Sequence, residues 1–348
     1  MYILIRKMEP TEAKEVKKLG IKSFRSFESL FVPVPKEALV AVMDSKIVAA
    51  VIVKYVHSKN SQKTGYIDFA FVDRAYHNQG IGRQIYKAAI DYLWDQGCSH
   101  ITALVKDDNV GSWSLFLKNG FERVSLYTLI KNIGTNGFWN HLIHTAIGWA
   151  AGMDLYLAES GGKAVQKEGG SFYQGFKYIL VNFLISLIVI IRLGLSQTMV
   201  FAGALLLVLS LSILTGYLGT VFSKRKWKFR LVNCGFLISV FMFLLGMIYP
   251  MVGNWYPDHY ENTGKFRKDL GIQAWVNWVG IFLFAFVSHI LSPYYLFFNY
   301  VYAICYMLLI FRILAVYPFS GFGGSRVLAW NKAVYLVTGL LTLGVLWL

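Results

Sequence analysis

The stretch VDRAYHNQGIGRQIYKAAIDYL, residues 72 to 93, joins a predicted strand to a predicted helix and places Gly80 and Gly82 at the start of that helix. Glycines at this point let an anion approach the backbone N–H groups closely, at the positive end of the helix dipole. The stretch therefore predicts a cradle for a phosphate or pyrophosphate group. The same glycines also suit an ordinary strand-to-helix turn, where they supply only backbone freedom.

Residues 1–133 alternate between two kinds of short sequence pattern. Strand-like runs such as ALVAVMD, IVAAVIVKYV and YIDFAFV are interspersed with helical runs such as TEAKEVKKLGIKSF and GRQIYKAAIDYLWDQG. The pattern predicts an α/β domain, with a mixed central sheet flanked by helices. Residues 134–175 are expected to form an interfacial or packed helix followed by a glycine-rich linker.

Residues 176–348 are rich in long apolar runs, each near the length that spans a bilayer core. We predict about six spans, at residues 176–191, 198–222, 231–253, 272–291, 294–316 and 333–348. The chain is therefore expected to be a multi-pass protein of the cell membrane. The loop SKRKWKFR, residues 223–230, is strongly basic, which favours a cytoplasmic location for that loop and for the N-terminal domain.

The formal net charge of +15 raises the question of an acidic partner. Nucleic acid is not expected, because the basic residues of the apolar part gather in loops between the runs, where they orient a membrane protein. The lipid bilayer is the expected partner. Cys98, Cys234 and Cys305 have neither a close pairing nor the spacing of metal ligands.

The order and spacing of the motifs over residues 1–131 resemble the GNAT acyltransferase family. The segments that carry the resemblance are the glycine loop, the strand YIDFAFVD before it, the strand ITALVKDDN after it and the closing NVGSWSLFLKNGFERVS. The resemblance implies an N-acetyltransferase with acetyl-CoA as cosubstrate. It also implies that the CoA pyrophosphate is held by Gln79, Gly80, Ile81, Gly82 and Arg83.

The loop departs from the family pattern at its first position, where the family has Arg or Gln and this chain has His77. An amine acceptor must lose a proton before it attacks a thioester, so a base is required. Asp68 matches the position where many family members carry a glutamate base, although a hydrogen-bonded strand aspartate explains it equally well. The backbone N–H groups of Phe71 or Val72 could stabilise the oxyanion.

A second departure concerns the proton that the leaving thiolate would take. The position of the family's tyrosine is Phe116, which cannot donate a proton. Either CoA leaves as a thiolate or through water, or another group such as Tyr127 substitutes. Asn109 and Ser112 are expected near the cofactor by the resemblance, although Asn109 suits a helix N-cap equally well.

The segment VYPFSGFGGSRVLAWNK, residues 316–332, resembles the loop that supplies an aspartate to zinc in site-2-protease-type membrane metallopeptidases. Gly323 stands where that aspartate would be, and the chain has no H-E-x-x-H pentad. In the corresponding helix, residues 215–219 cannot form the site. His141, His144 and His289 lack further ligands at motif spacing, so we expect no metal.

The predicted function is transfer of an acetyl or acyl group from CoA to an amine at the cytoplasmic surface of a membrane. The acceptor could be a small molecule, a lipid head group or a protein amine. The alternative is a regulatory or binding protein that senses acyl-CoA, with a pseudoprotease membrane domain that holds a membrane partner. Active intramembrane proteolysis is a third hypothesis, which the missing zinc ligands disfavour.

Overall fold

The computed structural model describes residues 3–24, 27–57, 63–106, 109–150, 153–162, 169–190, 195–232, 236–247, 249–261, 263–316 and 319–344. The chain divides into two compact units. The N-terminal unit comprises residues 1–105, 115–146 and 155–168, and the C-terminal unit comprises residues 106–114, 147–154 and 169–348. Each is described by itself.

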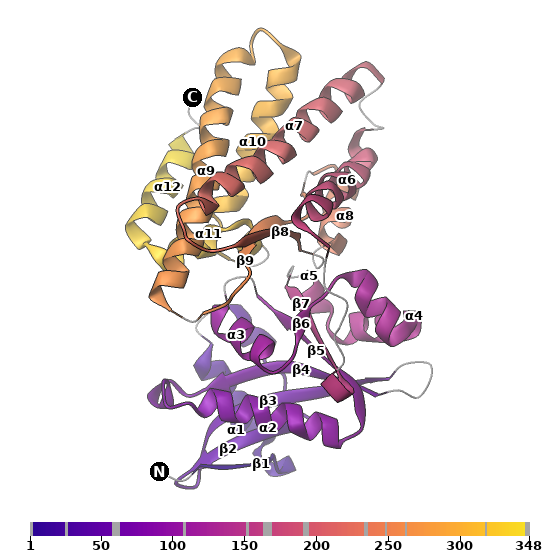
Figure 1. The fold of residues 1–348 in the computed structure, drawn as a ribbon, viewed down its shortest axis with the longest axis vertical. Helices are drawn as coiled ribbons and strands as arrows, with labels where there is room; N and C mark the ends of the chain where they lie inside the picture. The colour runs from indigo at the N-terminus through magenta and orange to yellow at the C-terminus, as the bar shows by residue number, and fades with distance from the viewer. Residues whose placement is uncertain are drawn as a thin grey trace. The chain divides into compact units, whose positions relative to one another are not determined.

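A seven-stranded mixed sheet, in the order β1-β2-β3-β4-β5-β7-β6, forms the framework of the N-terminal fold (Figure 1). Strands β1 to β4 pair antiparallel, β4 and β5 pair parallel, and β6 and β7 pair antiparallel. The strands are β1 Leu4–Lys7, β2 Ala38–Met43, β3 Lys46–His57, β4 Lys63–Val72, β5 Cys98–Val105, β6 Glu122–Arg123 and β7 Asp154–Glu159. The mixed sheet expected from the sequence is confirmed.

Helices cover both faces of this sheet. The helices of residues 1–162 are α1 Ala13–Ser23, α2 Ile81–Asp95, α3 Val110–Lys118, α4 Leu126–His144 and α5 Ala146–Ala150, with short 3₁₀ turns at Pro10–Glu12, Phe27–Phe31, Arg74–Tyr76 and Ser160–Gly162. Of these, α1, α2 and α4 pack on the sheet, whereas the first half of α3 and most of α5 belong to the C-terminal unit. Val40 and Ala50 pack in the cluster under α1. Leu39 and Val51, which alternate with them along the strands, are equally buried on the opposite face, since α2 packs on β2 and β3.

The helix predicted after residue 133 packs on the sheet. α4 runs through the predicted boundary, with a break in helical geometry at Gly134. Leu129, Phe138 and His141 are buried, and the Asn140 side chain donates to the His57 carbonyl at 2.9 Å. The range predicted as interfacial helix and linker also contributes strand β7, so the sheet extends past residue 133.

Helices α7, α9 and α10 pack against one another at the centre of the C-terminal unit (Figure 1). The helices of this unit are α6 Ser171–Ile190, α7 Leu195–Thr220, α8 Phe236–Leu244, α9 Gly264–Leu291, α10 Leu296–Ile313, α11 Gly324–Trp330 and α12 Lys332–Gly344. Strands β8 Trp227–Leu231 and β9 Gly253–Pro257 form a two-stranded antiparallel sheet, and a 3₁₀ turn follows at Phe319–Phe322.

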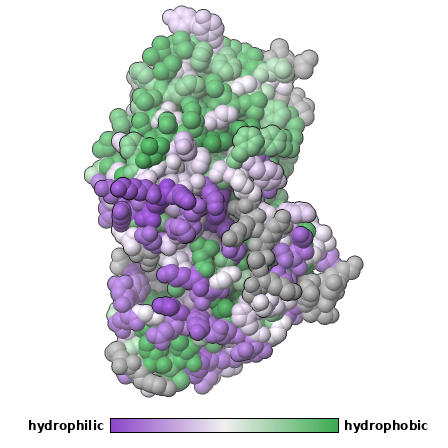
Figure 2. Space-filling model, viewed as in Figure 1, coloured by the Kyte–Doolittle hydropathy of each residue, from purple (hydrophilic) through white to green (hydrophobic). Residues whose placement is uncertain are grey.

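Three helices of the described chain are long and apolar enough to cross a bilayer, at Gln197–Thr220, Gly264–Leu291 and Leu296–Ile313. The six spans predicted from the sequence are therefore supported only in part. Residues 231–253, predicted as one span, instead hold the end of β8, the nine-residue helix α8 and the start of β9. Figure 2 shows a largely hydrophobic surface over the helices of the C-terminal unit. The exposed large apolar side chains of this unit include Leu214, Leu283 and Phe286.

The contact between α7 and α9 depends on a glycine. A Cβ atom on Gly219 would lie 2.6 Å from the backbone oxygen of Gln273, closer than real contacts allow. Backbone atoms in a packed helix cannot move aside cheaply, so overpacking of this kind costs about 1 to 3 kcal/mol.

We expect Gly219→Ala to lower the thermal unfolding midpoint of the detergent-purified protein. Gly339→Ala in α12 is the matched control, because a Cβ there meets nothing within 4 Å and alanine is the better helix former by about 1 kcal/mol. The control should leave the midpoint unchanged or raise it. Equal midpoints for the two variants would contradict the close approach of α7 and α9.

Candidate functional site

Strands β4 and β5 separate halfway along β4. Their parallel pairing runs from Lys63 to Ile67, which lies opposite Ala103, and residues 69–72 then pair with β3 alone. The edge of β4 that faces away from β3 therefore has no strand partner over these described residues. Unpaired backbone N–H and C=O groups along a strand are available to a ligand that lies in the opening.

A β-bulge marks the point of separation. The register between β3 and β4 pairs Ile52 with Phe69 and Val53 with Ile67, which leaves Asp68 as the extra residue. A bulge bends its strand and changes the direction of a side chain, and bulges are common beside active sites. The structure thus places the predicted base at the start of the opening.

Asp68 is a largely buried carboxylate with one cationic neighbour. Its side chain is 10% exposed, and one carboxylate oxygen lies 2.7 Å from Lys54 Nζ on β3. Burial raises the pKa of Asp68 above its ordinary value, and the attraction of Lys54 only partly offsets this rise. Asp68 therefore binds a proton more readily than an exposed aspartate, as a general base requires.

The loop after β4 is held by side chains at both of its ends. Asp73 accepts hydrogen bonds from the Ala75 N–H and from Lys22 Nζ, both at 3.1 Å, and these bonds lower its pKa. The His77 ring lies with Nε2 at 3.0 Å from the Val72 carbonyl, which can only accept, so Nε2 carries the proton. His77, at the position where the family has Arg or Gln, thus ties the loop back to β4.

The glycine pair opens helix α2 as the sequence predicts. Gly80 is the N-cap residue with φ of 77°, a conformation that favours glycine. A Cβ on Gly80 would meet nothing within 4 Å, and one on Gly82 would only touch Val72, at 3.6 Å. The first N–H groups of the helix have no intrahelical acceptor. This exposed turn therefore fits a pyrophosphate group.

Of the other residues predicted to contact the cofactor, some are exposed on the loop and others are buried in the core. Gln79 and Arg83 are exposed, whereas Ile81 is buried. Phe71 packs in the cluster under α1, so only its backbone could meet a ligand. The proposed oxyanion role of the Phe71 and Val72 N–H groups stays a prediction.

Phe116 fills the family's tyrosine position with a core side chain. It is 2% exposed, lies edge to face with Tyr86 and Phe121, and stacks on Tyr156 at 5.9 Å. Tyr127, the suggested substitute, is 68% exposed at the start of α4. No contact in the described chain joins Tyr127 to the glycine loop, so its catalytic role stays a prediction.

Asn109 is the N-cap of α3. Its side-chain oxygen accepts from the Ser112 N–H at 3.1 Å, which confirms the capping interpretation of Asn109. Both lie in the C-terminal unit of the chain. Their expected position near the cofactor stays a prediction.

His141 is committed to hydrogen bonds inside the N-terminal unit. Its Nε2 lies 2.9 Å from Thr102 Oγ1 and its Nδ1 lies 3.2 Å from Thr145 Oγ1. Burial lowers the pKa of His141 to about 4, so the ring is neutral at neutral pH. The described residues contain no group of three or more His, Cys, Asp or Glu that could hold a metal ion.

The predicted pseudoprotease features lie in ordinary packing positions. Gly323 is the N-cap of α11, with φ of 103°. Thr215 donates to the Leu211 carbonyl within α7, and His289 packs on the Tyr302 ring. The resemblance of this unit to site-2-protease-type proteins therefore stays a prediction.

Comparisons with known proteins match the N-terminal part of the chain. Residues 6–121 match the model of the acetyltransferase (GNAT) family. N-alpha-acetyltransferase 30 of Schizosaccharomyces pombe is 29% identical over 105 residues, which are 30% of this chain and 69% of that protein.

Two of the solved structures to which the chain is similar also match its N-terminal part. A NatC complex bound to Gag peptide and CoA is 16% identical, with a TM-score of 0.32, and the match covers 46% of this chain and 99% of that one. The ribosomal-protein-S18-alanine N-acetyltransferase of Escherichia coli is 20% identical, with a TM-score of 0.30, over 36% of this chain and 80% of that one.

The glycine loop gives a direct test of the cofactor site. Gly82→Val adds a branched side chain beside the predicted cradle, where only Val72 is close. We expect the affinity for acetyl-CoA to fall at least about tenfold, or 1.4 kcal/mol, because the pyrophosphate can no longer approach the N–H groups. Isothermal titration calorimetry on the purified full-length protein measures this affinity.

Lys87→Val is the matched control, since it places the same side chain at an exposed position of α2, beyond the predicted cradle. It should bind acetyl-CoA as the unmodified protein does. Unchanged affinity in Gly82→Val would remove the cradle interpretation.

Proposed function

We propose that this protein, whose N-terminal unit is a GNAT-type N-acetyltransferase domain with acetyl-CoA as cosubstrate, acetylates an amine at the cytoplasmic surface of a membrane. The observation that carries the proposal is the position of Asp68. This proton-accepting carboxylate lies at the bulge where β4 leaves β5, on the strand that leads into the glycine loop. The family match over residues 6–121 supports acetyl transfer as the reaction.

In the proposed reaction, the glycine turn, the edge of β4 and Asp68 each have a separate role. Bound acetyl-CoA supplies the acetyl group as a thioester. The turn at Gly80 and Gly82 holds the pyrophosphate, and the unpaired edge of β4 directs N–H groups at the carbonyl oxygen. Asp68 takes the proton that the amine loses as its nitrogen bonds to the carbonyl carbon and the carbon–sulfur bond breaks. Because Phe116 has no proton to give, the thiolate leaves without a donor at that position.

The C-terminal unit supports the membrane location. It has three helices of membrane-spanning length and an exposed apolar surface. Residues 223–230, which lead into and form most of β8, include five Lys and Arg residues and no Asp or Glu, as expected for a cytoplasmic loop. The acceptor is therefore an amine that is part of the membrane surface or is brought to it.

Among the three kinds of acceptor, a protein amine is the first candidate. The curated relative from Schizosaccharomyces pombe is by name an N-alpha-acetyltransferase. Small amines and aminolipid head groups are the other candidates, and a panel of the three distinguishes them by initial rate.

The alternative function is an acyl-CoA sensor that holds a membrane partner. The core position of Phe116 favours it, because the family's usual proton donor is missing. Both functions include acetyl-CoA binding. Only the enzyme releases free CoA in proportion to added amine, so a thiol assay during steady turnover separates the two.

Asp68 gives the pH test of the proposed mechanism. Asp68→Asn should lower kcat/KM about 10²- to 10⁴-fold, because no group then accepts the amine proton. Lys54→Met removes the cation that opposes the raised pKa, so the acidic limb of the kcat/KM profile should move to higher pH. The measurement is the rate of free CoA release against pH with a peptide amine.

Lys46→Met, an exposed lysine at the start of the same strand β3, is the matched control and should leave the profile in place. A further readout separates catalysis from folding. Because the folded state raises the pKa of Asp68, its stabilising contribution is present at low pH and is lost as the pH rises through the folded pKa. Asp68→Asn should therefore not lower the thermal midpoint at neutral pH, and a loss of activity that only follows a loss of folding would refute the base role.

A further inference from the structure

Arg312 is a buried cation within the helices of the C-terminal unit. It lies one residue before the end of α10 and is 9% exposed. Its Nε donates to Asn277 Oδ1 on α9 at 2.8 Å, and one terminal nitrogen donates to Ser212 Oγ on α7 at 2.7 Å. The other terminal nitrogen donates to the Leu308 carbonyl at 3.2 Å. All three acceptors are neutral.

The described residues offer Arg312 no counter-charge. Residues 169–348 contain only three acidic residues, Asp258, Glu261 and Asp269. Asp258 pairs with Lys228 at 2.9 Å, and the other two pair with Arg225 at 2.9 and 2.8 Å. Within the part of the chain that the structure describes, no carboxylate contacts Arg312.

A buried guanidinium without a counter-charge is costly, even when neutral acceptors replace part of its hydration. Ionisable groups at this depth among apolar helices are retained where they serve a function. The missing negative charge therefore points to an anion from outside the chain.

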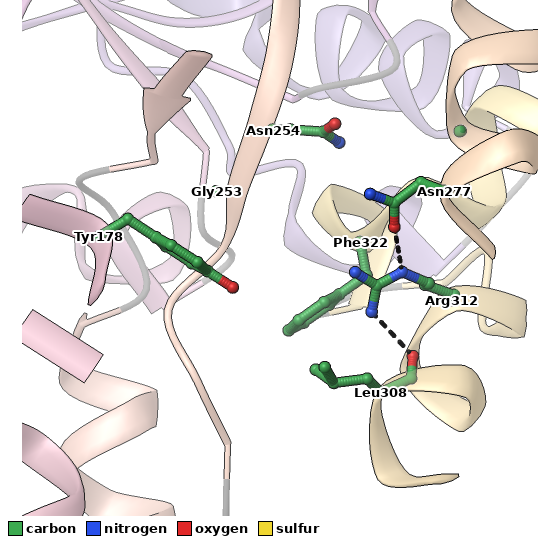
Figure 3. Close-up of a pocket in the computed structure, with 8 residues that line it drawn as sticks. Tyr178, Gly253, Asn254, Asn277, Leu308, Arg312 and Phe322 are labelled. Carbon is green, nitrogen blue, oxygen red and sulfur yellow. Dashed lines mark hydrogen bonds between the residues drawn. The ribbon is translucent and has the colours of Figure 1, made fainter. Parts of the chain in front are cut away.

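Arg312 also lines a small cavity whose free space is about 10 Å³, room for about one water molecule, so an oxyanion enters only if the lining side chains move apart (Figure 3). The cavity is formed by residues of α6, β9, α9, α10 and the following 3₁₀ turn, namely Tyr178, Gly253, Asn254, Ala274, Asn277, Leu308, Arg312 and Phe322. Figure 3 shows the Tyr178 hydroxyl pointing across this space toward the side of Arg312. The wall thus combines a cation with hydroxyl and amide groups.

The guanidinium keeps donors for a ligand. Arg has five N–H donors, and three are used by Asn277, Ser212 and Leu308. One hydrogen remains on each terminal nitrogen, so two donors are left. A pair of guanidinium N–H groups matches the two oxygens of a carboxylate or phosphate.

We propose that this cavity binds a single oxyanion, a carboxylate or a phosphate group, which neutralises Arg312. Ser212 lies eight residues from the end of α7, or about 12 Å along the helix axis. An oxyanion at that depth can come from an amphiphile in the bilayer or from solution. The site is independent of the acetyl-CoA site and of the proposed acetyl transfer.

The test uses the full-length protein in an uncharged detergent. The probes are inorganic phosphate and acetate as soluble oxyanions, and oleate and phosphatidic acid as amphiphilic ones, with phosphatidylcholine as the lipid without net charge. Thermal unfolding against probe concentration gives an apparent affinity. We expect at least one oxyanion to raise the midpoint in a saturable way, and phosphatidylcholine not to do so.

Arg312→Gln should weaken that affinity at least about tenfold, since it removes the charge and the paired donors. Arg225→Gln is the matched control, because it removes a guanidinium that already has carboxylate partners. It should leave the affinity unchanged. A response to phosphate or acetate assigns a soluble anion, and a response to oleate or phosphatidic acid alone assigns an amphiphile.

Tyr178→Phe covers the case in which Arg312→Gln does not fold. It removes a hydroxyl that faces the cavity and also hydrogen-bonds Ser212, and it keeps the three hydrogen bonds of Arg312. We expect it to weaken oxyanion binding severalfold, and to lower the midpoint without probe less than Arg312→Gln does. The proposal is overturned if no probe shifts the midpoint of the unmodified protein, or if Arg312→Gln folds and responds as that protein does. Either result would leave Arg312 as a tie between α7, α9 and α10.

Discussion

The N-terminal unit depends on a single change in strand pairing, the separation of β4 from β5 after Ile67. Up to that point the parallel ladder satisfies the backbone of both strands. Beyond it β4 continues on β3 alone, and the bulge at Asp68 sets the direction of the carboxylate. The strand ends at Val72, whose carbonyl accepts from His77, and the loop then delivers Gly80 to the start of α2. The proposed base and the proposed anion cradle thus both depend on one strand and the turn that follows it.

The sequence predicts the elements around this feature but not the feature itself. Glycines with β-patterned residues before them and helical spacing after them define the cradle, because turn chemistry is local. The bulge depends on one extra residue in YIDFAFVD relative to the neighbouring strand β3, and the residue pattern of neither strand shows this difference in register. Strand β7 was missed for a related reason, since DLYLAE is short, follows a helix and pairs with distant residues. Phe116 was identified as a departure, but its aromatic neighbours Tyr86 and Tyr156 are known only from the fold.

In the C-terminal unit, composition alone does not distinguish membrane-spanning helices from apolar segments that are buried inside the protein. An apolar run predicts a span by its length, yet burial inside a protein selects the same residues as exposure to lipid. Residues 231–253 therefore look like one span, although Tyr249 and Met251 are buried beside a short strand pair. Gly246, with φ of 82°, and Pro250 interrupt the run and are the sequence signals that argue against a continuous helix. In contrast, α9 and α10 combine length, hydropathy and an exposed apolar side.

The two units differ in whether a buried charged side chain has a partner of opposite charge. In the N-terminal unit burial raises the pKa of Asp68, and Lys54 on the neighbouring strand partly offsets this rise. Among the described residues of the C-terminal unit, the partners of Arg312 are amide, hydroxyl and carbonyl groups, and the three Asp and Glu side chains of residues 169–348 pair with other cations. An arginine cannot lose its proton as a buried acid can gain one. The first arrangement therefore suits a group that changes its charge during a reaction, and the second suits a permanent charge that an external anion completes.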